Sequence, residues 1–370
     1  MLSPEMEEGQ IRQAYNELLS RCQRLEKIIE LNDISGLAQI VSKYQNNSKE
    51  LLKQIAMILP TVEYAPEETK ELVKLIEYLE GVHEKLDAYV IKSNCITLVL
   101  DRETYFGAKK AMRTVSFLNR KGGVGKTTLS TNFAYAIYIM FKDSGLRILF
   151  IDNDAQGSAS DWFEADKQHG TMADVLMGKV SMRKAIQHTR YEGIDLIAAD
   201  ASLSEANDYL LRYGNPQDNS SFSQAWHEIA EDYDLCIIDN PPDMNFSVLE
   251  ALSVTDDVVI VTFPEEDSLA GAREIMGQIK QAKKFNHPLK LSGILVNAFS
   301  GNQAVHRCIE DMRNKHLPVF RTKIHYATLE AKNCMNLARR GKKSIFEVSP
   351  SCVIARDIFD FSKEYLGVAE

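Results

Sequence analysis

The chain has 370 residues, of which 45% are hydrophobic and 26% are charged. This composition is ordinary for a folded globular protein and excludes a disordered or collagen-like chain. No apolar run approaches the roughly 20 residues that a membrane-spanning helix needs, and the acidic start of the chain is unlike a secretory signal. The six cysteines show no C-x-x-C spacing, so we expect a reduced, cytoplasmic protein without a structural zinc or a disulfide framework.

The net charge of −9 is spread unevenly along the chain. Residues 271–370 carry 17 Lys and Arg against 9 Asp and Glu, whereas residues 1–270 carry 26 against 43. A basic segment in an otherwise acidic chain offers a local surface for a polyanion. A surface that is segregated by charge without such a role is the alternative interpretation.

Residues 1–110 predict an all-α N-terminal domain. Its first helix carries apolar residues at heptad spacing over nearly three repeats, namely Ile11, Tyr15, Leu18, Cys22, Leu25 and Ile29. Two more apolar stripes lie within residues 37–59 and 72–90. Three antiparallel helices that bury these stripes on one another account for the pattern, and so does a dimerisation or partner-binding module. The region shows no helix-turn-helix signature and is acidic, with 14 Lys and Arg against 18 Asp and Glu, which favours dimerisation or partner contact over DNA reading.

Residues 111–370 predict an α/β domain, because short apolar runs alternate with helical patterns. The runs span residues 114–118, 147–151, 194–198, 235–238, 258–263 and 291–296. Runs that are apolar on both faces are typical of parallel strands buried between two helix layers. The expected fold class is therefore a doubly wound, mostly parallel α/β sheet preceded by the N-terminal all-α domain.

A glycine-rich loop at residues 119–125 lies between the first expected strand and a helix. Glycines let successive backbone N–H groups turn toward phosphate oxygens, and the helix directs its positive N-terminal end at the same anion. Lys126 adds a full charge near the β- and γ-phosphates, and the Thr127 hydroxyl suits Mg²⁺. This order of strand, loop and helix predicts an ATP and Mg²⁺ site.

The loop departs from the common pattern G-x-x-x-x-G-K-[ST], because Arg120 stands where the first glycine would be and Lys121 follows it. Residues 121–128 read K-G-G-V-G-K-T-T. They resemble the deviant Walker A motif, K-G-G-x-G-K-[ST]-[ST], of the ParA/MinD family of ATPases.

Two acidic motifs extend this resemblance over about residues 112–366. Asp152 and Asp154 match the family motif D-x-D-P-Q-G, with Ala155 in place of the proline. Asp239 ends an apolar run and is followed by Asn240 and two prolines, which is similar to the family's Walker B strand, although asparagine is less usual there.

The resemblance implies a role for each matching residue. Lys121 would reach the phosphates of the opposite subunit in a nucleotide-sandwich dimer. Asp154 would orient the attacking water, Asn297 would contact adenine, and Asp152, Asp239 and Thr127 would form the Mg²⁺ site. The phosphates would be bound by Lys121, Gly122, Gly123, Val124, Gly125, Lys126, Thr127 and Thr128.

The residues support this interpretation independently of the family. The carboxyl ends of neighbouring parallel strands meet at one edge of a sheet, so Asp152, Asp154 and Asp239 are expected to converge there. Phosphoryl transfer depends mainly on positioning and charge neutralisation. A lysine that arrives only from a second subunit acts like an arginine finger, so we expect slow ATP hydrolysis that depends on dimerisation.

The function implied by the resemblance is that of a ParA-type partition ATPase. Its ATP-bound homodimer would bind nonspecific DNA on the nucleoid, and a ParB-like centromere-binding partner would stimulate hydrolysis. Four cations around Gly341 are the predicted DNA contacts, with a merely solvated helix face as the alternative: Arg339, Arg340, Lys342 and Lys343.

Two other functions use the same ATP cycle. One is a ParA-like spatial organiser of a protein cargo. The other is a MinD-like positioning ATPase at a membrane, which would end in a basic amphipathic helix. Residues 363–370 are short and acidic at the tip, so we expect no membrane partner.

Overall fold

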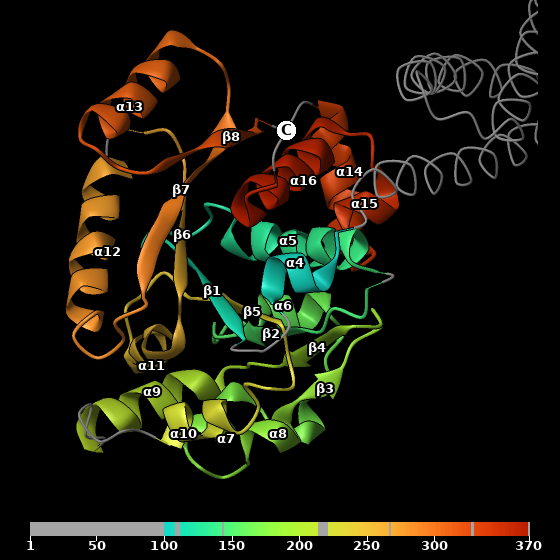
Figure 1. Cartoon of the computed structure of the whole chain (residues 1–370), viewed down its shortest axis with the longest axis vertical. Helices are drawn as coiled ribbons and strands as arrows, with labels where there is room; N and C mark the ends of the chain where they lie inside the picture. Colours follow the sequence, from blue (N-terminus) through green and yellow to red (C-terminus); the bar gives the residue numbers. More distant parts are fainter. Residues whose placement is uncertain are drawn as a thin grey trace, which may run out of the picture. The chain divides into compact units, whose positions relative to one another are not determined.

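The computed structural model describes residues 100–107, 112–142, 144–213, 221–265, 268–326 and 329–368. All of them belong to the second of the two units into which the chain divides, Leu98–Glu370 (Figure 1). The heptad pattern and the other helices expected within residues 11–90 lie outside the described residues, so they stay predictions.

The strands of the described part form one eight-stranded sheet with the order β3-β4-β2-β5-β1-β6-β7-β8. Their bounds are β1 Arg113–Leu118, β2 Ile148–Asp152, β3 Gln187–His188, β4 Ile194–Ile197, β5 Leu235–Asp239, β6 Asp257–Thr262, β7 Lys290–Phe299 and β8 Val319–His325. Neighbouring strands are parallel except for β3 and β4, which pair antiparallel. This arrangement confirms the expected fold class, and β3 and β8 are strands that the sequence analysis did not predict.

The helices cover both faces of the sheet (Figure 1). Their bounds are α4 Arg102–Phe106, α5 Lys126–Met140, α6 Ser158–Trp162, α7 Met172–Leu176, α8 Met182–Ala185, α9 Ser202–Tyr213, α10 Ser221–His227, α11 Phe246–Val254, α12 Ser268–Ala282, α13 Gln303–Asn314, α14 Leu329–Arg340, α15 Ile345–Val348 and α16 Val353–Leu366, with a 3₁₀ turn at Lys167–His169. Among these described helices, none has both the length and the apolar character needed to cross a membrane.

The central strands are buried on both faces, as their apolar runs predict. On one face Phe117 of β1 lies 5.5 Å from Phe133 of α5, ring centre to ring centre, and Phe133 lies 5.4 Å from Phe361 of α16. On the other face Ile151 of β2 and Ile238 of β5 join a buried cluster with residues of α7, α9, α10 and α11. Each such buried side chain stabilises the fold by roughly 1.5–3 kcal/mol. The ends of β2 and β5, where Asp152 and Asp239 lie, are therefore supported by a buried core on both faces of the sheet.

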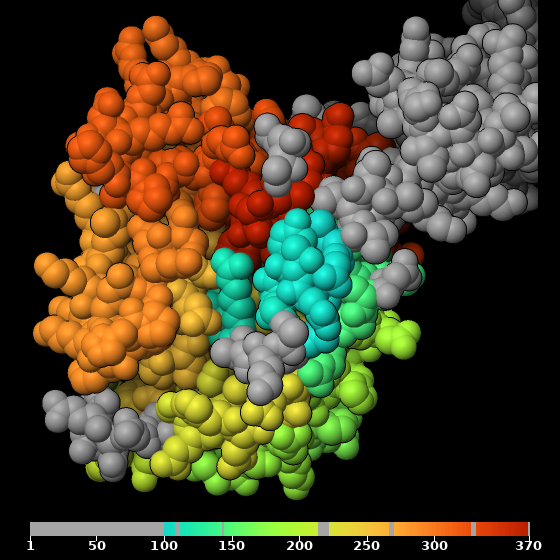
Figure 2. All heavy atoms as spheres, viewed as in Figure 1, coloured from blue at the N-terminus to red at the C-terminus, as the bar shows by residue number. Residues whose placement is uncertain are grey.

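Helix α4 belongs to the unit that carries the sheet and packs against the end of α5. Tyr105 and Phe106 contact Phe141, at the end of α5, with ring centres 5.9 and 5.6 Å apart. Arg102 Nε donates to Asp234 Oδ1 at 2.7 Å, directly before β5. Figure 2 shows the atoms of α4, in cyan, exposed on this face of the molecule. Residues 102–106 are therefore attached to the sheet although they precede residue 111, where the α/β domain was expected to begin.

Candidate functional site

The loop between β1 and α5 has the backbone that a phosphate-binding loop needs. Gly123 and Gly125 have φ angles of 75° and 92°, which L side chains rarely adopt. A Cβ added at Gly122 or Gly123 would meet no atom within 4 Å, so their backbone faces open space. At Gly125 a Cβ would lie 2.6 Å from the side chain of Asn297. Helix α5 begins at Lys126, with its N-terminal amides at this loop.

Lys126 is a buried cation at the start of α5. The residue is only 7% exposed, and its Nζ donates to the backbone oxygen of Asn119 at 3.2 Å. Burial lowers the pKa of Lys126, and the carboxylates of Asp239 and Asp154 offset part of this effect. A cation placed here can form charge-assisted hydrogen bonds with a phosphate.

Asp152 and Asp239 end two neighbouring parallel strands and are paired in register. Both residues are buried, at 0% and 1% exposure. Asp152 Oδ2 accepts hydrogen bonds from the Ser160 amide and hydroxyl, both at 2.7 Å, and Oδ1 accepts from the Asp154 amide at 3.1 Å. Burial raises the pKa of Asp152 to about 6. Asp152 therefore organises the loop between β2 and α6.

Asp239 differs from Asp152 because neither of its carboxylate oxygens has a hydrogen-bond partner of ordinary geometry. Burial, followed by the charge of Asp152, raises the pKa of Asp239 to about 7, while the nearby Thr127 hydroxyl and Lys126 ammonium lower it in part. A buried carboxylate without partners is costly. Its two oxygens are available to a cation or to the water around one.

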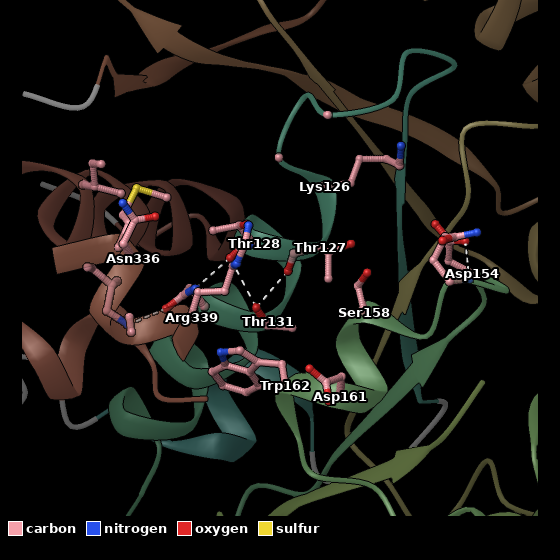
Figure 3. A pocket seen from close by; sticks show the side chains of 18 of the residues that line it. Lys126, Thr127, Thr128, Thr131, Asp154, Ser158, Asp161, Trp162, Asn336 and Arg339 are labelled. Atoms are coloured by element: carbon pink, nitrogen blue, oxygen red, sulfur yellow. Dashed lines mark hydrogen bonds between the residues drawn. The ribbon is translucent and has the colours of Figure 1, made fainter. Parts of the chain in front are cut away.

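A cavity of about 860 Å³ opens beside the loop and the start of α5. It is large enough for a nucleotide or a ligand of similar size. Asp154 and Ser158 come from the β2–α6 loop and α6, and Asn336 and Arg339 come from α14 (Figure 3). The lining includes Gly122, Gly123, Gly125, Lys126, Thr127, Thr128, Asp154, Ser158, Asp161, Trp162, Asn336, Arg339 and Lys343.

Lys121 and Asn297 make contacts within the chain. The Lys121 ammonium forms an ion pair with Glu265, which lies after β6, and its side chain is 56% exposed. Asn297 lies within β7, and its Nδ2 donates to the backbone oxygen of Val124 at 2.7 Å. The structure thus places Asn297 against the phosphate-loop backbone. The expected contact of Asn297 with adenine stays a prediction.

The predicted DNA-binding cations lie at the turn from α14 to α15, and two of them, Arg339 and Lys343, also line the cavity. Lys342 has a φ of 52° and its Nζ lies 3.0 Å from Asp161 Oδ1. Trp162 Nε1 donates to the backbone oxygen of Lys343 at 3.2 Å. Arg339, Lys342 and Lys343 therefore lie next to the cavity or to α6.

Asn132 is a buried residue of α5 that the sequence analysis missed. Its Oδ1 accepts from the Ser344 hydroxyl and the Ile345 amide, both at 2.8 Å, and its Nδ2 donates to the Thr128 backbone oxygen at 2.8 Å. The phosphate helix is thereby joined to the start of α15. The start of α5 carries several other polar residues, among them Ser130 and Thr131, so nothing in the sequence distinguishes Asn132.

Comparison with known proteins agrees with this geometry. A family model described as an AAA domain matches residues 112–291. The chromosome partitioning protein ParA of Myxococcus xanthus is 30% identical over 207 residues, which cover 54% of this chain and 70% of that relative. The chain belongs to the ParA/MinD family of P-loop ATPases. The resemblance seen in the motifs is thereby confirmed.

Two further proteins show how widely this likeness extends. The cell division protein PomZ of Myxococcus xanthus is 27% identical over 266 residues, which cover 70% of this chain and 78% of PomZ. The crystal structure of cobyrinic acid a,c-diamide synthase from Mycobacterium smegmatis has a TM-score of 0.56 and 24% identity, covering 68% of this chain and 93% of that one. That structure contains an ATP analogue and magnesium. It has the same fold as this chain.

Proposed function

We propose that this chain is a ParA-type ATPase that hydrolyses Mg²⁺-ATP at the cavity beside the phosphate loop. The observation that carries the proposal is that a buried cation, Lys126, lies close enough to a buried carboxylate, Asp239, for their charges to interact beside the phosphate loop. The open backbone at Gly122 and Gly123, with the amides of Val124, Gly125 and Thr128, would bind the phosphate oxygens.

The residues present fit a magnesium ion. Mg²⁺ binds through one or two carboxylates with water and phosphate oxygens completing its shell. Asp239 offers free carboxylate oxygens, and the Thr127 hydroxyl is near it. The described residues contain no group of three or more His, Cys, Asp or Glu side chains that could hold a metal alone. The ion would therefore arrive with the nucleotide and supply charge neutralisation at the phosphates.

The remaining acidic residues have separate roles in this proposal. Asp154 lines the cavity and would hold the attacking water. Asp152 already accepts hydrogen bonds from Ser160 and from the Asp154 amide, so it would position the loop that carries Asp154 and complete the surroundings of the metal. Asn297 would support the loop through Val124 and contact the base.

Dimerisation would complete the site through Lys121. Its ammonium pairs with Glu265 at a half-exposed position, where an ion pair is worth little, about 0–1 kcal/mol. Exchanging this contact for the phosphates of the opposite subunit is therefore favourable. ATP hydrolysis would be slow in the monomer and would increase on dimerisation.

The proposed biological role is DNA partition, in line with the name of the ParA relative. The ATP-bound dimer would bind nonspecific DNA of the nucleoid through cations that include Arg339, Arg340, Lys342 and Lys343, and a ParB-like partner would stimulate hydrolysis. Two copies of a cationic surface bind the DNA backbone more tightly than one. PomZ is named as a cell division protein rather than a partition protein, so a second candidate is a role outside DNA partition, such as the positioning of a protein cargo by the same ATP-dependent cycle.

Sedimentation velocity and DNA retention, each with and without Mg²⁺-ATP, test the proposal. We expect a dimer and salt-sensitive DNA binding only with ATP. The variant Arg340→Ala with Lys342→Ala should flatten the salt dependence of binding. The variant Lys283→Ala with Lys284→Ala, after α12, serves as the control with the same loss of charge. A monomer that binds DNA equally without ATP would contradict the partition role, and absence of ATP binding would contradict the site.

A further inference from the structure

Two buried asparagines lie directly behind the acidic motifs. Asn153 follows Asp152 at the end of β2, and Asn240 follows Asp239 at the end of β5. Asn153 is 0% exposed and Asn240 is 1% exposed. The Asn153 Nδ2 donates to Asn240 Oδ1 at 2.9 Å. In each case an asparagine directly follows, in the sequence, a carboxylate of the proposed site.

The asparagine pair joins three strands at the edge of the sheet. Asn240 Nδ2 donates to the backbone oxygens of Phe117 in β1, at 3.3 Å, and of Ile238 in β5, at 3.4 Å. The Asn153 amide donates to the Asp239 backbone oxygen at 2.9 Å. The two asparagines follow the last residues of β2 and β5. Their recorded side-chain hydrogen bonds go to each other and to backbone oxygens, so they leave the carboxylates of Asp152 and Asp239 to other partners.

Asp152 and Asp239 place two carboxylates side by side at the ends of β2 and β5. Asp152 and Asp239 are in register on neighbouring strands, and both are buried where charges are poorly screened. The negative charge of Asp152 raises the pKa of Asp239 and so disfavours its ionisation. Ser160 and the Asp154 amide compensate Asp152, whereas the Thr127 hydroxyl and the Lys126 ammonium offset only part of the cost of ionising Asp239. Hydrogen bonds between the two strand ends therefore help to hold this edge closed.

We propose that Asn153 and Asn240 are paired positioning residues, whose hydrogen bond holds the ends of β2 and β5 together against the repulsion between Asp152 and Asp239. The pair thereby keeps the two carboxylates at the separation that receives a nucleotide-bound Mg²⁺. This statement about the ligand rests on the proposed function. Neither amide touches the ligand, so both act through the carboxylates beside them.

A double-mutant cycle tests the pair. The concentration of Mg²⁺ that gives half-maximal binding of a fluorescent ATP analogue is measured for the full chain and for Asn153→Ala, Asn240→Ala and the double variant. Each single change should raise this concentration about tenfold, as expected for coupled neighbours. Asn240→Ala also loses the bond to Phe117, so it should have the larger effect. The double variant should match Asn240→Ala, because both single changes remove the same contact.

A matched control separates positioning from general stability. Asn286→Ala removes two hydrogen bonds to backbone oxygens, those of Leu252 and Thr255, away from the acidic motifs. It should lower the melting temperature without changing the Mg²⁺ requirement. Effects that multiply in the double variant, or single variants that bind Mg²⁺ as the unmodified chain does, would overturn the proposal.

A second measurement needs no nucleotide and therefore stands apart from the proposed function. Asn153→Ala is made in the unmodified chain and in an Asp239→Asn background, and thermal unfolding is followed without ligand. Because the neutral side chain removes the repulsion, the loss of melting temperature should be clearly smaller in the Asp239→Asn background. An equal loss in both backgrounds would refute the proposed role of the pair, even if the protein binds ATP.

Discussion

Replacing Asp239 with asparagine should make the free protein more stable while strongly reducing the proposed ATPase activity. The residue is 1% exposed, and burial together with Asp152 raises its pKa from 3.8 to about 7. Each unit of pKa corresponds to about 1.4 kcal/mol. Keeping this carboxylate ionised in the folded protein above pH 7 therefore costs up to about 4 kcal/mol. Asparagine has nearly the same shape and carries no charge.

The sign of the effect follows from the direction of the pKa change. Between pH 3.8 and about 7 the folded protein keeps a proton on Asp239 that the unfolded chain has lost. The stability of the unmodified protein should therefore fall as the pH rises through this window, and Asp239→Asn should lack this contribution. If structural relaxation around Asp239 halves this ionisation cost, the Asp239→Asn variant should melt about 4–8 °C higher than the unmodified protein at pH 8. This gain in melting temperature should shrink toward pH 5.

Calorimetry without nucleotide at pH 5, 6, 7 and 8, together with an ATPase assay, measures both effects. Turnover should fall at least ~100-fold, since the variant loses the free carboxylate for the metal. Asp208→Asn, which neutralises an exposed carboxylate on α9, controls for the change in net charge. An unchanged or lower melting temperature at pH 8, or a gain that is independent of pH, would refute the reasoning.

Three other substitutions test separate parts of the site. Lys126→Ala should weaken Mg²⁺-ATP binding at least ~100-fold, because a charge-assisted phosphate contact is lost; titration calorimetry measures this, with circular dichroism as the check on folding. Lys121→Ala should keep ATP affinity within about threefold but abolish the ATP-dependent dimer in sedimentation, and a persisting dimer would contradict its role. Asn132→Ala leaves Ser344 and Ile345 without their acceptor, so urea unfolding should show a loss of about 2–4 kcal/mol, with a smaller loss for Asn132→Asp.

The parts of the site that could be predicted are those that depend on local sequence and on strand direction. The glycines and Lys126 lie in one continuous loop between a strand and a helix, so their contacts follow from the chain itself. Asp152 and Asp239 are 87 positions apart, yet their proximity was predictable because both end buried parallel strands. The bounds of the six predicted strands differ from those in the structure by a residue or a few.

The parts that could not be predicted depend on partners far away in the chain. Strand β8 has only two buried residues, Phe320 and Ile324, four positions apart, unlike the continuous apolar runs of the central strands, so its pattern gave no clear signal. The ion pair of Lys121 with Glu265 spans 144 positions. The bond from Trp162 to Lys343 spans 181. Neither residue type nor spacing identifies such a partner, because many polar residues are equally available.

The cations around Gly341 show why this difference matters for function. From the sequence they are four neighbouring charges at a helix end, which suits a DNA surface. In the structure Arg339 and Lys343 line the cavity, Lys342 pairs with Asp161 of α6, and Asn132 joins the following residues to the phosphate helix. DNA bound by these cations would therefore lie close to the nucleotide. Three contacts join this segment to α5 and α6, the two helices that begin at the phosphate loop and just after Asp154. We therefore expect nucleotide binding to change the DNA affinity of these cations, and a DNA affinity that is the same with and without Mg²⁺-ATP would contradict this expectation.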